Sequence, residues 1–211
     1  DDAFQTVRPL PRRLRGAVPE PGWHAMRAVA ADRELSPLTS SIGRLLDAVG
    51  ALCGLGAEVS YEGQTAIMLE AAAWEAAGAT RSGGGGAGYE LELGERDGVL
   101  VLDPRALVRA VTLDVERGAD VPAIAAGVHE ALARATAQAL ERVAADGGVG
   151  TAGLSGGVFQ NRWLLQAVSA RLDRAGLRVL VPERLPPNDG GVSFGQAAIA
   201  AARDAVARQP G

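Results

Sequence analysis

The chain has 211 residues, of which 47% are hydrophobic and 22% are charged, so it holds enough apolar material for a packed core and global disorder is excluded. Its formal net charge of −4 gives no general attraction to nucleic acid or to an anionic membrane, and no apolar run approaches the roughly 18 residues of a membrane span. The single cysteine, Cys53, excludes an internal disulfide and a cysteine-rich zinc cluster, which fits a cytoplasmic protein.

The first part of the chain is predicted to be helical. Apolar residues recur at helical spacing in three segments, which we predict to be helices: residues 22–34, 42–52 and 64–76. Ser40 or Ser41 can cap the second of these helices. These three segments together predict a helical subdomain.

A glycine-rich tract marks the internal boundary. Residues 81–88 read RSGGGGAG, and each glycine loses more backbone freedom on ordering than other residues do. We expect this tract to be a loop between a helical subdomain over residues 21–80 and an α/β lobe over residues 89–208. Residues 1–20 are expected to be a linker or the truncated edge of a preceding lobe.

The second part of the chain is predicted to alternate strands and helices. A β-hairpin is expected from residues 89–93 and 99–102, because a turn containing Asp97 and Gly98 separates them. Six further elements follow, namely helices over residues 104–117 and 121–145, a strand over 149–154, a helix over 161–175, a strand over 177–181 and a helix over 191–207. The last four indicate βαβ units on a parallel sheet, so the predicted fold class is α/β.

Two glycine-rich turns follow the last two predicted strands, at residues 155–157 and 188–191. Ligands of open α/β sheets bind beyond the carboxyl ends of the strands, so we expect both turns to meet at one cleft. Glycine lets backbone N–H groups converge on an anion at the positive end of a helix. Either turn alone is an ordinary turn former, but the pair, with Asn161 and Asp189 beside it, predicts a phosphate-handling site.

Two carboxylates are candidate ligands. Asp189 precedes glycines that permit close approach, although a metal site needs further ligands from elsewhere. Asp47 lies in an otherwise apolar helix and needs a compensating partner, for which a ribose, an arginine or a backbone group would each serve. The two histidines, His24 and His129, lie on separate predicted helices, and we expect His129 to pack or hydrogen-bond where its helix meets the sheet.

Four segments closely resemble the C-terminal part of the HypF-type hydrogenase-maturation carbamoyltransferases: SSIGRLLDAVGALCGL, YEGQTAIMLE, LSGGVFQNRWLL and PPNDGGVSFGQA. Their order and spacing match as well. The resemblance implies a threonylcarbamoyl-transferase-like domain and the C-terminal lobe of an actin-like ATPase (ASKHA) fold, in which two lobes surround a nucleotide cleft. It also implies transfer of the carbamoyl group of carbamoyl-adenylate, made from carbamoyl phosphate and ATP with magnesium, to the C-terminal cysteine of a hydrogenase-maturation partner for cyanide-ligand synthesis.

The same resemblance assigns roles to individual residues. It implies that Asp47 and Gly63 contact the ribose of the nucleotide. It also implies that Gly156 and Gly157 donate backbone hydrogen bonds near phosphate and that Asn161 contacts the nucleotide. It implies that Asp189 is a ligand of a divalent metal, iron or zinc. The family's metal site also needs a histidine pair with HxxxH-like spacing, which does not occur in this sequence.

The absence of this histidine pair, and of the regions that precede this domain in full-length members of the family, predicts a C-terminal fragment that does not complete carbamoyl transfer alone. Its expected partners are the N-terminal lobe and upstream domains of such an enzyme, the carbamoyl-acceptor protein, and a second copy of the chain in a homodimer. Two alternatives stay open: the domain of an antibiotic O-carbamoyltransferase, whose acceptor is a sugar hydroxyl, and a non-catalytic lobe that only docks a partner. A sugar or acetate kinase of the same superfold fits the motifs poorly.

Overall fold

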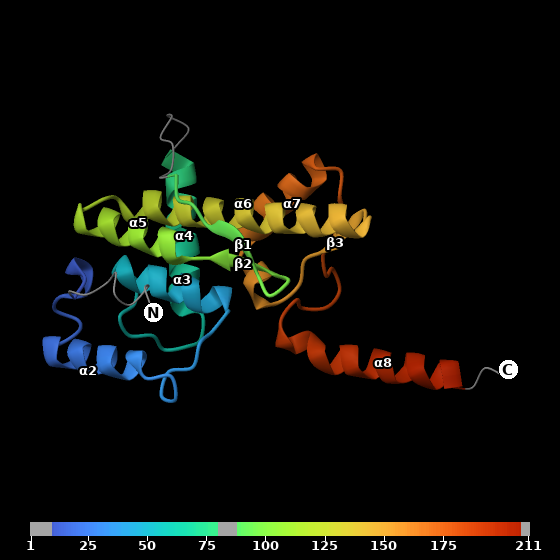
Figure 1. Cartoon of the computed structure of the whole chain (residues 1–211), viewed down its shortest axis with the longest axis horizontal. Helices are drawn as coiled ribbons and strands as arrows, with labels where there is room; N and C mark the ends of the chain where they lie inside the picture. Colours follow the sequence, from blue (N-terminus) through green and yellow to red (C-terminus); the bar gives the residue numbers. More distant parts are fainter. Residues whose placement is uncertain (1–9, 80–87, 208–211) are drawn as a thin grey trace.

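Helices dominate the computed structural model, which describes residues 10–79 and 88–207 (Figure 1). The elements in chain order are η1 (Arg12–Leu14), α2 (Glu20–Ala31), α3 (Ile42–Leu52), α4 (Gln64–Ala79), β1 (Glu92–Arg96), β2 (Val99–Asp103), α5 (Arg105–Glu116), α6 (Val121–Gly147), β3 (Thr151–Gly153), η3 (Gly157–Gln160), α7 (Arg162–Arg174), β4 (Arg178–Leu180), η4 (Asp189–Gly191) and α8 (Val192–Ala207). Every predicted helix is present. The glycine-rich tract, apart from Gly88, lies outside the described residues.

The helix α6 is the centre of the fold, and α4 and α7 both pack against it. Ten of its 27 residues are buried, and five of these are alanines, whose small side chains allow neighbouring helices to approach closely. Gly148 ends the helix in the left-handed conformation with φ of 62°. The buried side chains of α3, α4, α5, α6 and α7 belong to one hydrophobic cluster. Cys53 lies in this cluster, and burial raises its pKa to about 11.

Residues near the N-terminus pack against the end of α5. Leu10 and Leu14 are buried. The backbone N–H of Arg12 donates to Glu116 Oε1 at 2.8 Å, and the guanidinium of Arg13 donates to the carbonyl of Ala119 at 2.9 Å. This segment therefore lies against α3 and α5 and is tied to the end of α5 by hydrogen bonds.

The predicted hairpin is present, but its first strand begins later than expected. β1 and β2 pair antiparallel around Asp97 and Gly98, whose φ values of 53° and 74° fit a type I′ turn. The expected start at Tyr89 was wrong because this residue is held by helices instead of by a strand. Its hydroxyl donates to Asp114 Oδ2 on α5 at 2.8 Å, and its carbonyl accepts from Arg134 on α6 at 2.6 Å.

The strands β3 and β4 form the predicted parallel pair, with α7 between them in the chain. The pair is short, since only Thr151 to Gly153 align with Arg178 to Leu180. The N–H of Leu154 extends the pairing by donating to the carbonyl of Leu180 at 2.9 Å. The carboxyl ends of both strands therefore lie side by side. The first glycine turn follows β3 after Leu154, and the second follows β4 after residues 181–187.

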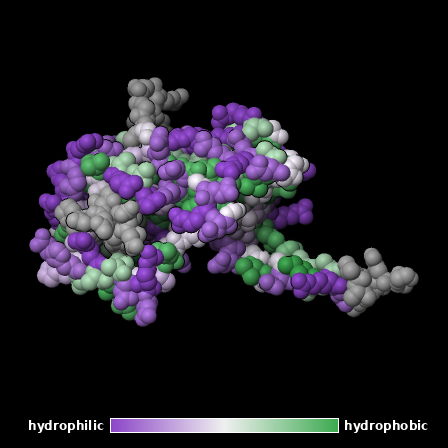
Figure 2. Space-filling view, in the orientation of Figure 1, coloured by the Kyte–Doolittle hydropathy of each residue, from purple (hydrophilic) through white to green (hydrophobic). Residues whose placement is uncertain are grey.

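The last helix, α8, points away from the other helices (Figure 1). Its residues 192–204 are exposed except for the half-buried Gly195. Apolar side chains are among them, including Val192, Phe194 and Ile199, each at least half exposed, and Figure 2 shows hydrophobic surface along this helix. Among the described residues, no helix combines the length and the hydropathy needed to cross a bilayer.

Candidate functional site

The two glycine turns adjoin at the carboxyl ends of β3 and β4, as predicted. The N–H of Gly156 donates to the carbonyl of Pro187 at 2.7 Å, and the hydroxyl of Ser155 donates to the same oxygen at 3.4 Å. On the next residue, a Cβ added to Gly157 would lie 3.9 Å from the Cβ of Asn188. The first turn is thus attached to the second by its own backbone.

Glycine is required at two positions of these turns for different reasons. Gly156 has φ of 97° and ψ of 159°, a conformation that side chains rarely adopt. A Cβ at Gly191 would lie 2.8 Å from the carbonyl oxygen of Pro186. The N–H of Gly156 is already donated to Pro187, so Gly157 is the residue of the first turn that we keep as a candidate phosphate donor.

Asn161 lies at the start of α7, immediately after the first turn. Its Oδ1 accepts from the N–H of Leu164 at 2.9 Å and caps the helix. Its Nδ2 lies 2.9 Å from Nε2 of His129 on α6. The residue is only 9% exposed. The prediction that His129 packs or hydrogen-bonds is confirmed, but it does so against the start of α7 and not against the sheet. Its partner is Asn161, the residue predicted to bind the nucleotide.

The amino end of α7 is also occupied by Glu70, which sequence analysis did not single out. Its Oε1 accepts from the backbone N–H of Arg162 at 2.8 Å and from that of Trp163 at 3.4 Å. Together with the Asn161 cap, these bonds use the first N–H groups of the helix. A carboxylate of α4 therefore already fills the amino end of α7, and this helix end offers no free first-turn N–H group to a phosphate. The sequence signal was an acidic residue at the end of the segment YEGQTAIMLE.

Asp47 and Gly63 lie close to each other through Arg44. The guanidinium of Arg44 contacts Asp47 Oδ2 at 3.2 Å and Glu62 Oε1 at 3.0 Å, which joins α3 to the loop before α4. Of the partners that the sequence left open for Asp47, the structure shows the arginine. The Asp47 side chain is still 26% exposed, so part of its carboxylate faces solvent.

The helix α4 connects this first cluster to the glycine turns. Gly63 precedes α4 with φ of 79°, and a Cβ there would meet open space. Glu70 lies seven residues further on, which corresponds to about 10 Å along a helix axis. The structure therefore forms two clusters, one around Asp47 and Gly63 and one around Asn161, that α4 holds at a fixed separation.

Asp189 begins η4 in the second turn, where its side chain is exposed. The neighbouring Asn188 caps this short helix by accepting from the N–H of Gly190 at 3.1 Å. Within residues 10–79 and 88–207, no group of three or more histidine, cysteine, aspartate or glutamate residues stands close enough to hold a metal ion. The described residues therefore do not form a complete metal site around Asp189.

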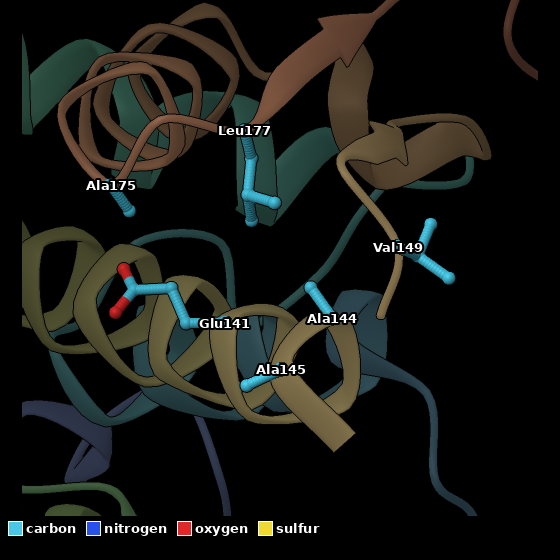
Figure 3. Close-up of a pocket in the computed structure, with 6 residues that line it drawn as sticks. All are labelled: Glu141, Ala144, Ala145, Val149, Ala175 and Leu177. Carbon is cyan, nitrogen blue, oxygen red and sulfur yellow. The ribbon is translucent and has the colours of Figure 1, made fainter. Parts of the chain in front are cut away.

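A small open cavity of about 290 Å³ lies at the opposite ends of the parallel strands (Figure 3). Its lining comes from the end of α6 and from residues just before β3 and β4: Glu141, Ala144, Ala145, Val149, Ala175 and Leu177. Only one of these side chains is polar. Because ligands bind at the carboxyl ends of parallel strands, the glycine turns remain the better candidate site.

Comparison with known proteins agrees with this geometry. Residues 6–196 match the family model described as "Carbamoyltransferase, Kae1-like Domain, second subdomain". This places the chain in a class of carbamoyltransferase domains. The chain belongs to the HypF carbamoyltransferase family.

Individual relatives support this membership. The chain is 37% identical over 169 residues to "Carbamoyltransferase HypF" of Synechocystis sp. and 33% identical over 212 residues to "Carbamoyltransferase HypF2" of Cupriavidus necator. These alignments cover 78% and 90% of this chain but 20% and 25% of the relatives. The chain thus spans about a fifth to a quarter of their length.

Solved structures give the same result. A crystal structure of full-length HypF "in the phosphate- and nucleotide-bound form" superposes with a TM-score of 0.78 at 30% identity, covering 94% of this chain and 24% of that chain. The crystal structure of T. kodakarensis HypF superposes with a TM-score of 0.70 at 25% identity. The α/β fold of this chain is therefore similar to part of these enzymes.

The buried histidine of the site leads to a pH prediction. Burial lowers the pKa of His129 from its ordinary value of 6.5, against the opposing effects of the Ala125 carbonyl and the charge of Glu70. Below pH 6.5 the unfolded chain binds a proton here that the folded chain does not, so the free energy of unfolding should fall as the pH decreases through this range. Urea denaturation between pH 7.5 and 5 measures this slope.

Two variants serve as controls for the slope. His129→Gln should flatten it, whereas His24→Gln, a change at an exposed residue, should leave it as in the parent chain. The hydrogen bond with Arg105 lowers the pKa of Asp103 from its ordinary value of 3.8. Protonation of Asp103 therefore also lowers the free energy of unfolding, but only near and below pH 3.8, outside the measured range. An equal slope in the parent chain and His129→Gln would contradict the prediction.

Proposed function

We propose that this chain forms one side of the nucleotide cleft of a HypF-type carbamoyltransferase that works in the cytoplasm, with the architecture of an actin-like ATPase lobe. The observation that carries the proposal is the bond between Gly156 and Pro187, which joins two glycine turns beside the buried amide of Asn161. It is supported by the similarity to a HypF structure whose title states bound phosphate and nucleotide.

The proposed reaction transfers a carbamoyl group from carbamoyl-adenylate, formed from carbamoyl phosphate and magnesium-bound ATP. The thiolate of the C-terminal cysteine of a hydrogenase-maturation partner attacks the carbamoyl carbon, a C–S bond forms, and the C–O bond to the phosphate of AMP breaks. The electron pair of that bond leaves with AMP, and the proton that the thiol lost to become a thiolate goes to solvent or to a base. In this proposal the thiocarbamate is the precursor of a cyanide ligand.

The residues of this chain supply binding in that reaction. The partly exposed carboxylate of Asp47 accepts hydrogen bonds from ribose hydroxyls, and the absence of a side chain at Gly63 leaves room for the sugar. Gly157 offers a backbone N–H to phosphate, while Gly156 holds the turn in place. Asn161 contacts the nucleotide with the donor and acceptor capacity of its amide that His129 and Leu164 do not use.

Asp189 is proposed as one ligand of a divalent metal, iron or zinc. Such an ion polarises a carbonyl or stabilises a leaving phosphate when it is bound. Because one exposed carboxylate does not make a site, its other ligands would come from outside this chain. We assign no step of the reaction to it.

An interaction role is the second candidate, and α8 favours it. The exposed Val192, Phe194 and Ile199 form apolar surface of a kind that marks protein contacts. In that case the chain docks the remaining part of a HypF-type enzyme without binding nucleotide itself. An antibiotic O-carbamoyltransferase would share the cleft, and an assay with thiol and sugar acceptors would separate it.

Calorimetric titration of magnesium and ATP into the 211-residue chain tests the proposal. Asp47→Ala and Asn161→Ala should each weaken binding by about 10-fold or more, because each removes a hydrogen-bonding group worth about 1.5 kcal/mol or more. Asp146→Ala, at an exposed carboxylate near the end of α6, is the matched control and should bind as the parent does. Absence of binding by the parent chain would overturn the nucleotide role and leave the docking role.

A further inference from the structure

A fully buried histidine holds the amide of Asn161 from behind. His129 is 0% exposed and lies on α6, the central helix, whereas Asn161 begins α7. We propose that His129 is a positioning residue that fixes the side chain of Asn161 in the orientation that contacts the nucleotide. This inference rests on the proposed function, because it assigns the nucleotide contact to Asn161.

The hydrogen bonds of the histidine determine its tautomer. Nδ1 lies 2.8 Å from the carbonyl oxygen of Ala125, which can only accept, so Nδ1 carries the proton. In the neutral ring Nε2 is then an acceptor. It lies 2.9 Å from Nδ2 of Asn161, which donates to it. The backbone of α6 thus selects a ring that can accept from the asparagine.

These bonds also determine which way the asparagine amide points. Its oxygen must face the N–H of Leu164 and its nitrogen must face His129. Rotating the amide by 180° would place the oxygen against the acceptor Nε2 and the nitrogen against a donor. One Nδ2 hydrogen and one lone pair of Oδ1 remain for a ligand. The pair of fixed contacts therefore presents a defined donor and acceptor to the cleft.

The surroundings leave the imidazole little freedom. The ring of Trp163 lies beside it, with centroids 6.1 Å apart, and Trp74 packs edge-on against Trp163 at 5.0 Å. Glu70, which caps α7 next to Asn161, is the charged group that acts on the histidine electrostatically. Helices α4, α6 and α7 thus meet at one buried group, which makes the position of Asn161 depend on all three.

The test compares variants that keep or remove the acceptor. His129→Gln retains a side-chain oxygen that can accept from Asn161, and His129→Leu replaces the ring with an apolar group. Leu132→Ala is the matched control, because Leu132 is buried one turn further along α6 and its truncation destabilises the core. Leu132 makes neither of the hydrogen bonds that hold the side chain of Asn161. Magnesium and ATP are titrated into each variant at a temperature at which circular dichroism shows it to be folded.

A spectroscopic measurement on the parent chain accompanies the titration. In a chain labelled with ¹⁵N-histidine, the spectrum should show His129 with a protonated Nδ1 and an unprotonated Nε2. Adding ATP should shift the Nε2 resonance of His129, because its hydrogen-bond donor engages the ligand, and should leave the exposed His24 unchanged. This readout does not depend on whether any variant folds.

The expected results separate a positioning role from a structural one. His129→Leu should weaken ATP binding by about 10-fold or more, and His129→Gln should stay within about threefold of the parent chain. Three results would each overturn the inference: parent-like ATP binding by His129→Leu, an equal loss of ATP binding in Leu132→Ala, or an Nε2 resonance that ATP does not shift. If the parent chain binds ATP in such an experiment, the proposed function still stands. No binding by the parent chain would overturn the proposed function and this inference together.

Discussion

Replacing Asn161 with alanine is expected to lower the free energy of unfolding by about 2–4 kcal/mol, because the change removes a helix cap and leaves a buried histidine without its donor. The cap is the bond from the N–H of Leu164 to Asn161 Oδ1, and the donor is Nδ2 facing His129. Both groups lie in the interior, so water does not readily replace them. Urea denaturation at pH 7.5 gives the difference.

The neighbouring turn provides the matched control. Asn188 also caps a helix with its side chain, by accepting from the N–H of Gly190, but η4 has three residues and Asn188 is only half-buried. Asn188→Ala should therefore cost about 1 kcal/mol or less. Equal losses for the two variants would show that the bond to His129 adds nothing to the cap.

Replacing Gly50 with alanine is expected to destabilise the chain by about 1–3 kcal/mol, although alanine is the better helix former by about 1 kcal/mol. Gly50 lies in α3 where this helix meets α4, and an added Cβ would lie 2.3 Å from Cγ2 of the buried Thr65. The contact forces the helices apart. Thermal or urea denaturation of Gly50→Ala measures the loss.

The clash can be removed from the other side. Thr65→Ser deletes the Cγ2 methyl group and keeps the hydroxyl, so the double variant should recover most of the stability that Gly50→Ala loses. The coupling between the two changes, measured as a double-mutant cycle, should be at least about 1 kcal/mol. A stabilising Gly50→Ala would mean that α3 and α4 do not approach as closely as described.

Local sequence signals predicted the helices well, because capping and periodicity act within one element. The helix α3 has the predicted bounds and is capped by Ser41, one of the two residues proposed. The same signals gave a wrong strand boundary where a segment is held by residues that are distant in the sequence. The alternation at Tyr89 reflects burial against α5 and α6, and no local pattern distinguishes this from strand pairing.

The site shows the same division. The convergence of the two glycine turns followed from the rule for parallel strands and is confirmed by the bond between Gly156 and Pro187. The contact of Glu70 with α7 joins residues 92 positions apart, and the bond between His129 and Asn161 joins residues 32 apart. Pairings over such distances depend on how the helices pack against one another, so the sequence alone identifies the groups but not their partners.

The exposed helix α8 has a thermodynamic consequence. Helices in proteins owe most of their stability to the packing of an apolar face, and the 16-residue helix α8 has the side chains of residues 192–204 largely in solvent. We therefore expect α8 to be among the least stable elements and to open without unfolding the core around α6. Any surface that covers its apolar side chains also raises its helix content. The folding of α8 and its binding to another surface are therefore coupled equilibria, so a change in the helix content of α8 reports on binding.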